Sequence, residues 1–228
     1  MTTRPFTYFV FSILSLLLIG NTAFSQQTDL RLRLFGELEK EIVKDLNVSL
    51  EYEHRFNKNL TAFDKAFFEP SLSYDFNKQY RIGASCRMGL SDNVVRKRKY
   101  QYRTSAYLQY RFKVDDFRIR FRTVLQYGFD DISSISSFLV NNLVNRNSVQ
   151  VDYDWFGSRL RPYAKYEFFF HVNHPQGGII NQQRFSAGTK YKVSKALSLN
   201  AFYMFENEFN IVSPINSHIF GFGASYSL

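Results

Sequence analysis

The sequence has few of the residues that cross-link a small fold or interrupt its secondary structure. It has one cysteine, Cys86, so no intramolecular disulfide can form, and stability must come from packing or from strand closure. Five prolines and one tryptophan accompany 25 phenylalanines and 15 tyrosines, a composition typical of β-strands. After the N-terminus there is no second long apolar run and no low-complexity linker, which indicates one domain.

The N-terminal residues 1–25 have the layout of a secretory signal peptide. Arg4 is followed by the apolar stretch FTYFVFSILSLLLI and then by the small-residue exit Ala23-Phe24-Ser25. The apolar stretch is short for a membrane-spanning helix, which needs roughly 20 residues. We therefore predict cleavage before Gln26 and a single exported domain over residues 26–228.

The chain is basic, with a formal net charge of +9. Such a charge can indicate a nucleic-acid partner. Here the charges alternate along strand-like segments and do not gather in one patch, and an exported chain rarely meets nucleic acid. We expect no nucleic-acid partner.

The stretch DFRIRFRTVLQYGF shows the alternation most clearly. Arg118, Arg120 and Arg122 alternate with Phe117, Ile119 and Phe121, so in a strand one face is cationic and the other apolar. A soluble sheet would place the arginines in water, whereas a membrane barrel places the apolar face on lipid and the charges in the lumen.

Alternating segments of about ten residues recur along the whole chain, separated by connections of two lengths. Short polar turns are expected at 44–45, 77–78, 115–116, 157–158 and 194–195, and longer connections near 57–64, 91–97, 128–142, 172–181 and 211–217. Short turns alternating with long loops are typical of outer-membrane barrels, whose periplasmic turns are tight and whose extracellular loops are long. We predict an all-β, antiparallel transmembrane β-barrel in the outer membrane.

The number of strands is ambiguous. We find eleven strand-like segments, whereas bacterial single-chain barrels have an even number of strands and both termini in the periplasm. Residues 30–43 also fit an amphipathic helix, and as a strand this segment would have to begin outside the cell. We predict about 12 strands, with 10 as the alternative.

The C-terminal sequence GASYSL resembles the sorting strand that the barrel-assembly machinery recognises. Gly223, Tyr226 and Leu228 carry the resemblance, although Phe is the usual last residue where this chain has Leu228. The resemblance implies outer-membrane lipid and the assembly machinery as partners.

Nearly the whole mature chain resembles a family of bacterial outer-membrane barrels known only as a domain of unknown function. The resemblance is carried by ELEKEIVKDLNVSLEYEHRF, FNKQYRIGASCRM, VDDFRIRFRTVLQY and GFGASYSL. It supports the fold and implies no activity.

The lumen of such a barrel would have two walls of opposite charge. The basic wall comprises Arg81, Arg87, Arg103, Arg111, Arg118, Arg120 and Arg122. The acidic wall comprises Glu51, Glu53, Glu69, Asp75, Glu206 and Glu208, and we expect it roughly opposite the arginines. If water separates the walls, the barrel is a small passive pore that favours anionic solutes; if they touch, it is a closed structural or interaction barrel.

A third possibility is an outer-membrane lipid hydrolase with a Ser–His pair at the outer rim. The candidate histidines are His54, His218 and the pair His171 and His174, and none comes with a recognisable serine motif. The histidine pair also lacks the carboxylates or thiols that a metal site needs. We therefore expect no enzymatic activity, no metal and no cofactor.

Overall fold

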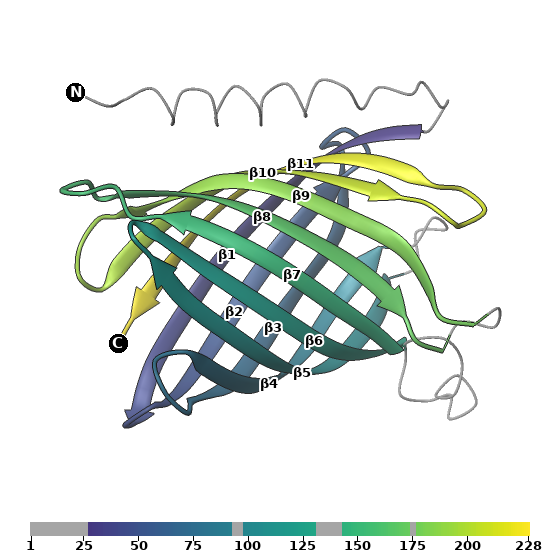
Figure 1. Cartoon of the computed structure of the whole chain (residues 1–228). Coiled ribbons are helices and arrows are strands. Elements are labelled where there is room, and N and C mark those ends of the chain that lie inside the picture. The colour runs from purple at the N-terminus through teal and green to yellow at the C-terminus, as the bar shows by residue number, and fades with distance from the viewer. Residues whose placement is uncertain (1–26, 93–97, 131–142, 174–176) are drawn as a thin grey trace.

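The structure is a computed structural model that describes residues 27–92, 98–130, 143–173 and 177–228. These residues form one closed β-barrel in which the strands follow each other around the ring in sequence order (Figure 1). The predicted signal peptide, residues 1–25, lies outside the described residues. The strands are β1 (Gln27–Val43), β2 (Leu46–Asn57), β3 (Ala62–Asp75), β4 (Tyr80–Asp92), β5 (Arg98–Val114), β6 (Phe117–Asp130), β7 (Leu143–Tyr153), β8 (Leu160–His171), β9 (Ile179–Lys192), β10 (Leu197–Glu208) and β11 (Ile215–Ser227).

The prediction of twelve strands is wrong, and so is the alternative of ten. In the described chain the ring closes with eleven strands, because β1 pairs directly with β11. Residues 30–43, for which a helix was the alternative, lie in β1. Consecutive strands are antiparallel, so with eleven strands the first and the last run the same way and their pairing is parallel. The barrel is therefore mixed and not fully antiparallel as predicted.

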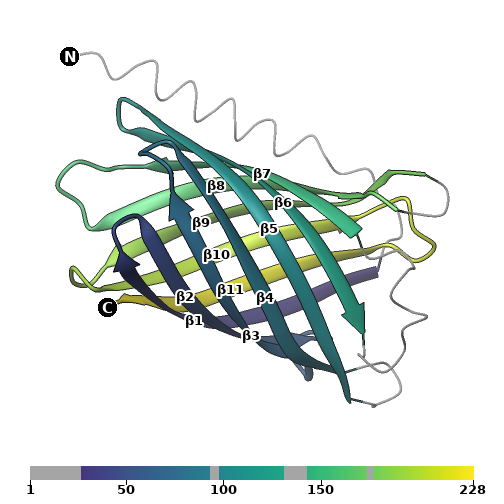
Figure 2. The same ribbon diagram turned by 90° about the horizontal axis from the view of Figure 1, so that it is seen from below.

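The parallel seam between β1 and β11 is long and regular. It runs without a register shift from the pair Gln27–Ile215 to the pair Glu39–Ser227. The start of β1 and the end of β11 consequently lie at opposite ends of the barrel (Figure 2). The even-number rule assumes that both ends of the barrel chain emerge on one side, and this chain does not meet that condition.

The five predicted short turns all join consecutive strands at one end of the barrel. The tightest turns are 44–45 and 115–116, where Asp45 and Asp115 have φ angles of 66° and 50°. Aspartate tolerates this left-handed region better than most residues, which is why it serves in two-residue hairpins. At the other end the connection predicted over 57–64 is shorter than expected, because β2 continues to Asn57 and β3 begins at Ala62.

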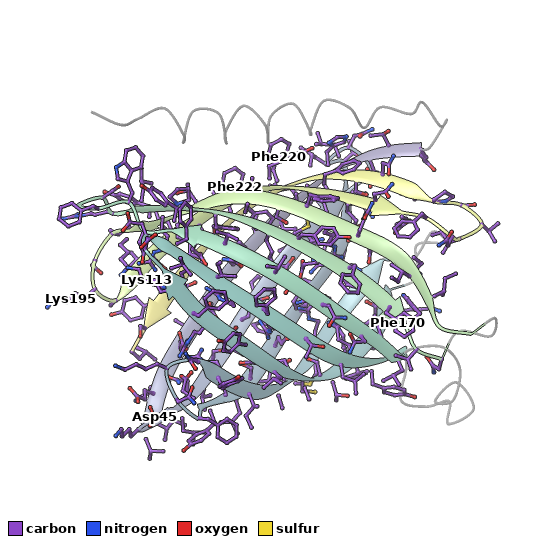
Figure 3. The ribbon with its side chains drawn as sticks, in the orientation of Figure 1. Asp45, Lys113, Phe170, Lys195, Phe220 and Phe222 are labelled. Carbon is purple, nitrogen blue, oxygen red and sulfur yellow. The ribbon has the colours of Figure 1, made fainter. Side chains whose placement is uncertain are left out.

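The two faces of the barrel differ in chemistry along every strand. Large apolar side chains point outward, as Phe220 and Phe222 do on β11 (Figure 3), where they are 43% and 51% exposed. Polar and charged side chains point inward, including the buried Glu53, Asp152 and Glu206. Asp45, Lys113 and Lys195 gather at the short-turn end (Figure 3). The barrel is thus apolar outside and polar inside, the reverse of a soluble protein.

Candidate functional site: the polar lumen

A cavity of about 690 Å³ occupies the middle of the barrel. Its lining extends from Arg81 near the short-turn end of β4 to His171 at the opposite end of β8. Among the described residues, twelve basic side chains and six carboxylates line it. The basic residues are Arg33, Arg55, Lys65, Arg81, Arg87, Arg103, Arg120, Arg122, Arg146, Lys165, Arg184 and Lys190, and the acidic residues are Glu37, Glu39, Glu51, Glu53, Glu69 and Glu167.

The alternating stretch on β6 has its charged face toward the lumen. Phe121 and Leu125 are exposed on the outer surface, whereas Arg120 and Arg122 line the cavity. Arg118, nearer the short turn, reaches Asp154 with an Nη2–Oδ2 distance of 3.0 Å.

Five of the seven arginines of the predicted basic wall pair with carboxylates one or two strands away or in the turn after β7. Arg81 and Arg111 share Asp75 on β3, with N–O distances of 2.6 and 2.7 Å. Arg87 pairs with Glu69, also on β3. Because β3 pairs with β4, and β4 with β5, these two carboxylates lie beside the arginines and not across the lumen from them as expected.

On the other side of the basic wall, β7 and the turn after it supply carboxylates that the sequence interpretation missed. Arg120 pairs with Asp152, which is almost completely buried, at 3.4 Å. Asp154 pairs with Arg118, Arg161 and Lys113 at 3.0, 2.7 and 3.6 Å. Strand parity contained the signal for Asp152, since it lies an even number of residues from the inward-facing Arg146.

Asp154 lies outside the strands, in the turn between β7 and β8. Burial by itself would raise the pKa of the Asp154 carboxyl, but the surrounding cations, Arg118 foremost, outweigh burial and lower that pKa below its ordinary value. Asp154 is therefore an ionised carboxylate that holds three cationic side chains at the short-turn end of the lumen.

The remaining residues of the predicted acidic wall lie around the seam. Glu53 pairs with Arg55 and, at 3.8 Å, with Arg33. Glu206 contacts three arginines of β1 and β9: Arg31 at 3.3 Å, Arg33 at 3.8 Å and Arg184 at 2.6 Å. Glu51 lines the cavity, and Glu208 accepts a hydrogen bond from the backbone N–H of Ile215.

The ion pairs follow the barrel wall and do not cross the lumen. Within the described ranges, the widest pair around the ring is Arg81–Glu39, at 4.0 Å, which joins β4 to β1. Strands on opposite walls of this ring are five positions apart. The carboxylates therefore neutralise cations on their own side of the barrel, and no ion pair among the described residues spans the cavity between the walls.

Two arginines differ from the others in the described lumen, because neither has a carboxylate partner. Arg103 donates a hydrogen bond from Nη1 to the side-chain oxygen of Gln126 at 3.2 Å. The Arg122 guanidinium lies over the Tyr107 ring, with Cζ 3.8 Å from the centroid, and its buried Nε has no hydrogen-bond partner. The sequence placed both residues in the basic wall without indicating that they would differ from their neighbours.

Two of the candidate rim histidines, His54 and His218, lie among aromatic side chains on the outer face. His54 contacts Phe56 and Phe63, and its ring nitrogen is 3.2 Å from the Tyr52 hydroxyl. His218 is 2.7 Å from the Tyr203 hydroxyl. Neither hydrogen-bonds to a serine within the described chain; His171 lines the cavity, and His174 is outside the described residues.

The residues of the predicted assembly signal have separate structural roles in β11. Gly223 faces inward, where the Phe35 ring lies against it and leaves no room for a Cβ. Tyr226 is exposed and pairs with Leu38 across the seam. The backbone N–H of Leu228 donates to the carbonyl of Glu39 at 2.8 Å. Recognition by the assembly machinery stays a prediction.

Other kinds of site are not visible in the part of the chain that the structure describes. It contains no group of three or more His, Cys, Asp or Glu side chains that could hold a metal ion. No helix in these ranges has the length and apolar character needed to cross a membrane.

Comparison with known proteins identifies a family for this chain. The sequence pattern of a family described as "Protein of unknown function (DUF2490)" matches residues 31–214. No curated protein matches the chain.

Similar solved structures include a bacterial polysaccharide outer membrane secretin, at 12% identity and a TM-score of 0.41, covering 77% of this chain and 72% of that one. The β domain of the Bordetella autotransporter BrkA gives 13% identity and a TM-score of 0.46, covering 86% and 97%. OmpT of Vibrio cholerae gives 10% identity and a TM-score of 0.37, covering 72% and 54%.

Proposed function

This chain belongs to the DUF2490 family of proteins of unknown function, and we propose that it is a non-enzymatic outer-membrane β-barrel, a small passive pore whose lumen favours anionic solutes. The proposal has two parts, a membrane location and a selective lumen. Each part has its own structural support and its own test.

The distribution of apolar side chains supports the membrane location. Large apolar residues cover the outside, among them Leu34, Phe68, Leu108, Phe185 and Phe222, each more than a third exposed. Monomeric soluble proteins rarely expose large continuous apolar surfaces. The strands contain 11 to 17 residues, and about 9–11 tilted residues suffice to cross a bilayer.

The orientation follows from the general layout of outer-membrane barrels. The short-turn end, which contains the end of β11, would face the periplasm, and the other end would face outside. β1 would then begin at the outer side, as its parallel pairing with β11 requires. The closing strand, with Tyr226 and Leu228, would be the segment offered to the barrel-assembly machinery.

The excess of basic side chains around the cavity is the single observation that carries the functional proposal. Twelve cations and six carboxylates line the cavity. Three further carboxylates, those of Asp75, Asp152 and Glu206, pair with arginines of the lining. The described lumen therefore keeps a net positive charge, and enclosure by a low-dielectric wall strengthens its attraction for anions.

The closed-lumen barrel is the second candidate. It is favoured by the number of ion pairs, which keep long side chains inside a ring of only eleven strands. Barrels of about eight strands are just filled by their own side chains. A closed barrel would act structurally or through its loops.

Fractionation and electrophysiology test the two parts in turn. We expect the mature protein in the outer membrane fraction, with different gel mobility before and after boiling in detergent. Recovery as a soluble periplasmic monomer would refute the membrane location. In planar bilayers we expect discrete single-channel steps in KCl, whereas correctly folded protein without any conductance would favour the closed barrel.

A further inference from the structure

Arg103 and Arg122 are the two arginines of the predicted basic wall for which the described chain supplies no carboxylate. The nearby carboxylates have other partners: Glu69 pairs with Arg87, and Glu167 pairs with Arg146 and Lys165. Buried cations are normally paired, because an uncompensated charge in an enclosed site is unfavourable. Among the described residues, these two guanidiniums therefore have no carboxylate of their own within ion-pair distance.

Arg103 and Arg122 contact neighbouring inward-facing positions of the β5–β6 pair. Arg103 is opposite Gly128, yet it donates to Gln126, the register partner of Ser105. Arg122 is opposite Gln109, yet its guanidinium lies over Tyr107. Each guanidinium therefore contacts a side chain two residues along the strands from its own register position. In both cases the displacement is toward the other arginine. The two levels, Ser105 and Tyr107, are about 7 Å apart along β5.

The surroundings strengthen the demand for an anion. Arg146 adds positive charge near both guanidiniums, whereas Glu69 acts on both only from beyond ion-pair distance, and the three arginines line the same cavity. Gln126 accepts from Arg103 through its oxygen, which leaves its NH₂ group as a donor. The Arg122 Nε is buried with no acceptor.

We propose that Arg103 and Arg122, with Gln126 between them, form a lumenal binding site for a small oxyanion of the phosphate type. A planar guanidinium donates two parallel hydrogen bonds to an oxyanion, which a spherical chloride cannot accept in the same way. The positions that the two guanidiniums contact, at the level of Ser105 and of Tyr107, are about 7 Å apart along β5, so one oxyanion between them would lie beside both side chains. The site deepens the proposed function and rests on it in requiring that solutes enter the lumen.

Calorimetry on the folded full-length mature protein in detergent tests the site, with inorganic phosphate as the probe and ionic strength held constant with KCl. We expect saturable binding of one phosphate per barrel, with sulfate competing and chloride not. Arg122→Gln and Arg103→Gln should each weaken phosphate binding at least tenfold. Arg122→Lys, which keeps the charge but loses the planar fork, should bind phosphate more weakly than the wild type.

The control is Arg159→Gln, which removes one positive charge from an exposed turn residue outside the lumen. It should leave the phosphate affinity unchanged. The shift on boiling in a detergent gel identifies variants that have folded. Should a glutamine variant fail to fold, the comparison of phosphate with chloride on the wild type still decides, because wild-type protein without saturable phosphate binding overturns the site.

Unchanged phosphate affinity in both glutamine variants would also overturn the site. Calorimetry does not depend on conduction, so the site and the pore can fail separately. Phosphate binding without conductance would retain the site and refute the pore. Conductance without phosphate binding would retain the pore and refute the site.

Discussion

The Arg122 guanidinium stacks on the ring of Tyr107 across the β5–β6 pair, with Cζ 3.8 Å from the ring centroid. The ring in turn lies over Gly83 on β4, where a Cβ would be only 2.5 Å from Tyr107 Cζ. A glycine on one strand thus makes room for the aromatic ring that positions a cation two strands away.

We predict that Gly83→Ala displaces the Tyr107 ring and weakens phosphate binding through Arg122. The loss should lie between about twofold and thirtyfold, the range that corresponds to a cation–π contact of about 0.5–2 kcal/mol. The matched control is Gly36→Ala, because nothing lies within 4 Å of a Cβ at Gly36. Equal affinities in calorimetry of Gly83→Ala and Gly36→Ala would contradict this role of Tyr107.

The parallel seam predicts which cysteines can be cross-linked. In a protein with Cys86 replaced by Ser, the double variant Leu34→Cys and Phe222→Cys should form a disulfide, because the two residues are register partners and adjacent Cα atoms fall within disulfide range. Leu38→Cys with Phe222→Cys is the control, offset by about 13 Å along the strands. Cross-linking is read from gel mobility with and without reductant, and a barrel closed by a twelfth strand would give no Leu34–Phe222 cross-link.

Asp154 should make the stability of the short-turn end depend on pH. Its pKa is lower in the folded than in the unfolded protein, so its stabilising contribution is complete above the unfolded value near 3.9 and is lost as pH falls through the folded value. At neutral pH, Asp154→Asn should lower the melting midpoint by about 2–4 °C if the partly exposed pairs contribute about 1 kcal/mol together.

The melting difference between the wild type and Asp154→Asn should shrink below pH 4 and vanish at lower pH. Circular dichroism melts over this pH range measure it. A difference that stays constant down to pH 2 would mean that the ionised carboxylate is not what stabilises the turn.

Removing residues 226–228 should impair insertion of the barrel. The deletion removes the outward Tyr226 and the backbone hydrogen bonds of Ser227 and Leu228 to Ala196 and Glu39. The amount of boiling-sensitive protein in the outer membrane should fall severalfold, whereas Val212→Ser, in a fully exposed loop, should leave it unchanged. Insertion of the truncated chain at the wild-type level would refute the sorting role of the closing strand and leave the fold intact.

Local patterns made the hairpins and the two faces predictable. Alternation with a period of two fixes which side chains share a face, so Arg118 and Arg120 could be separated from Phe121 without knowing their partners. The turn at 115–116 was equally predictable, because aspartates between two alternating segments favour a tight hairpin.

Closure and ion pairing could not be predicted in the same way. The pairing of β1 with β11 joins strands almost a chain length apart, and no local signal encodes it. Partner choice depends on register: Asp152 is opposite Arg118, yet its carboxylate pairs with Arg120. The isolation of Arg103 and Arg122 from carboxylates emerges only when every neighbouring strand is in place.

The arginines of β6 should contribute to the selectivity of the lumen. Replacing Arg118, Arg120 and Arg122 together by Ser removes three cations from one strand and should lower the preference for anions. The effect should shrink in high salt, since the screening length falls from about 10 Å at 0.1 M to about 3 Å at 1 M. The same change at exposed turn residues, Lys78, Arg159 and Lys195 to Ser, should alter selectivity much less.

The most direct test of a positively charged, conducting lumen is the reversal potential of single wild-type barrels in a planar bilayer with a tenfold KCl gradient. Perfect selectivity would place this potential about 59 mV from zero. We predict a value displaced from zero toward the chloride equilibrium potential and moved back toward zero by the triple Arg→Ser change. A conducting wild type with a reversal potential at zero or on the potassium side, unaffected by the triple change, would contradict the account.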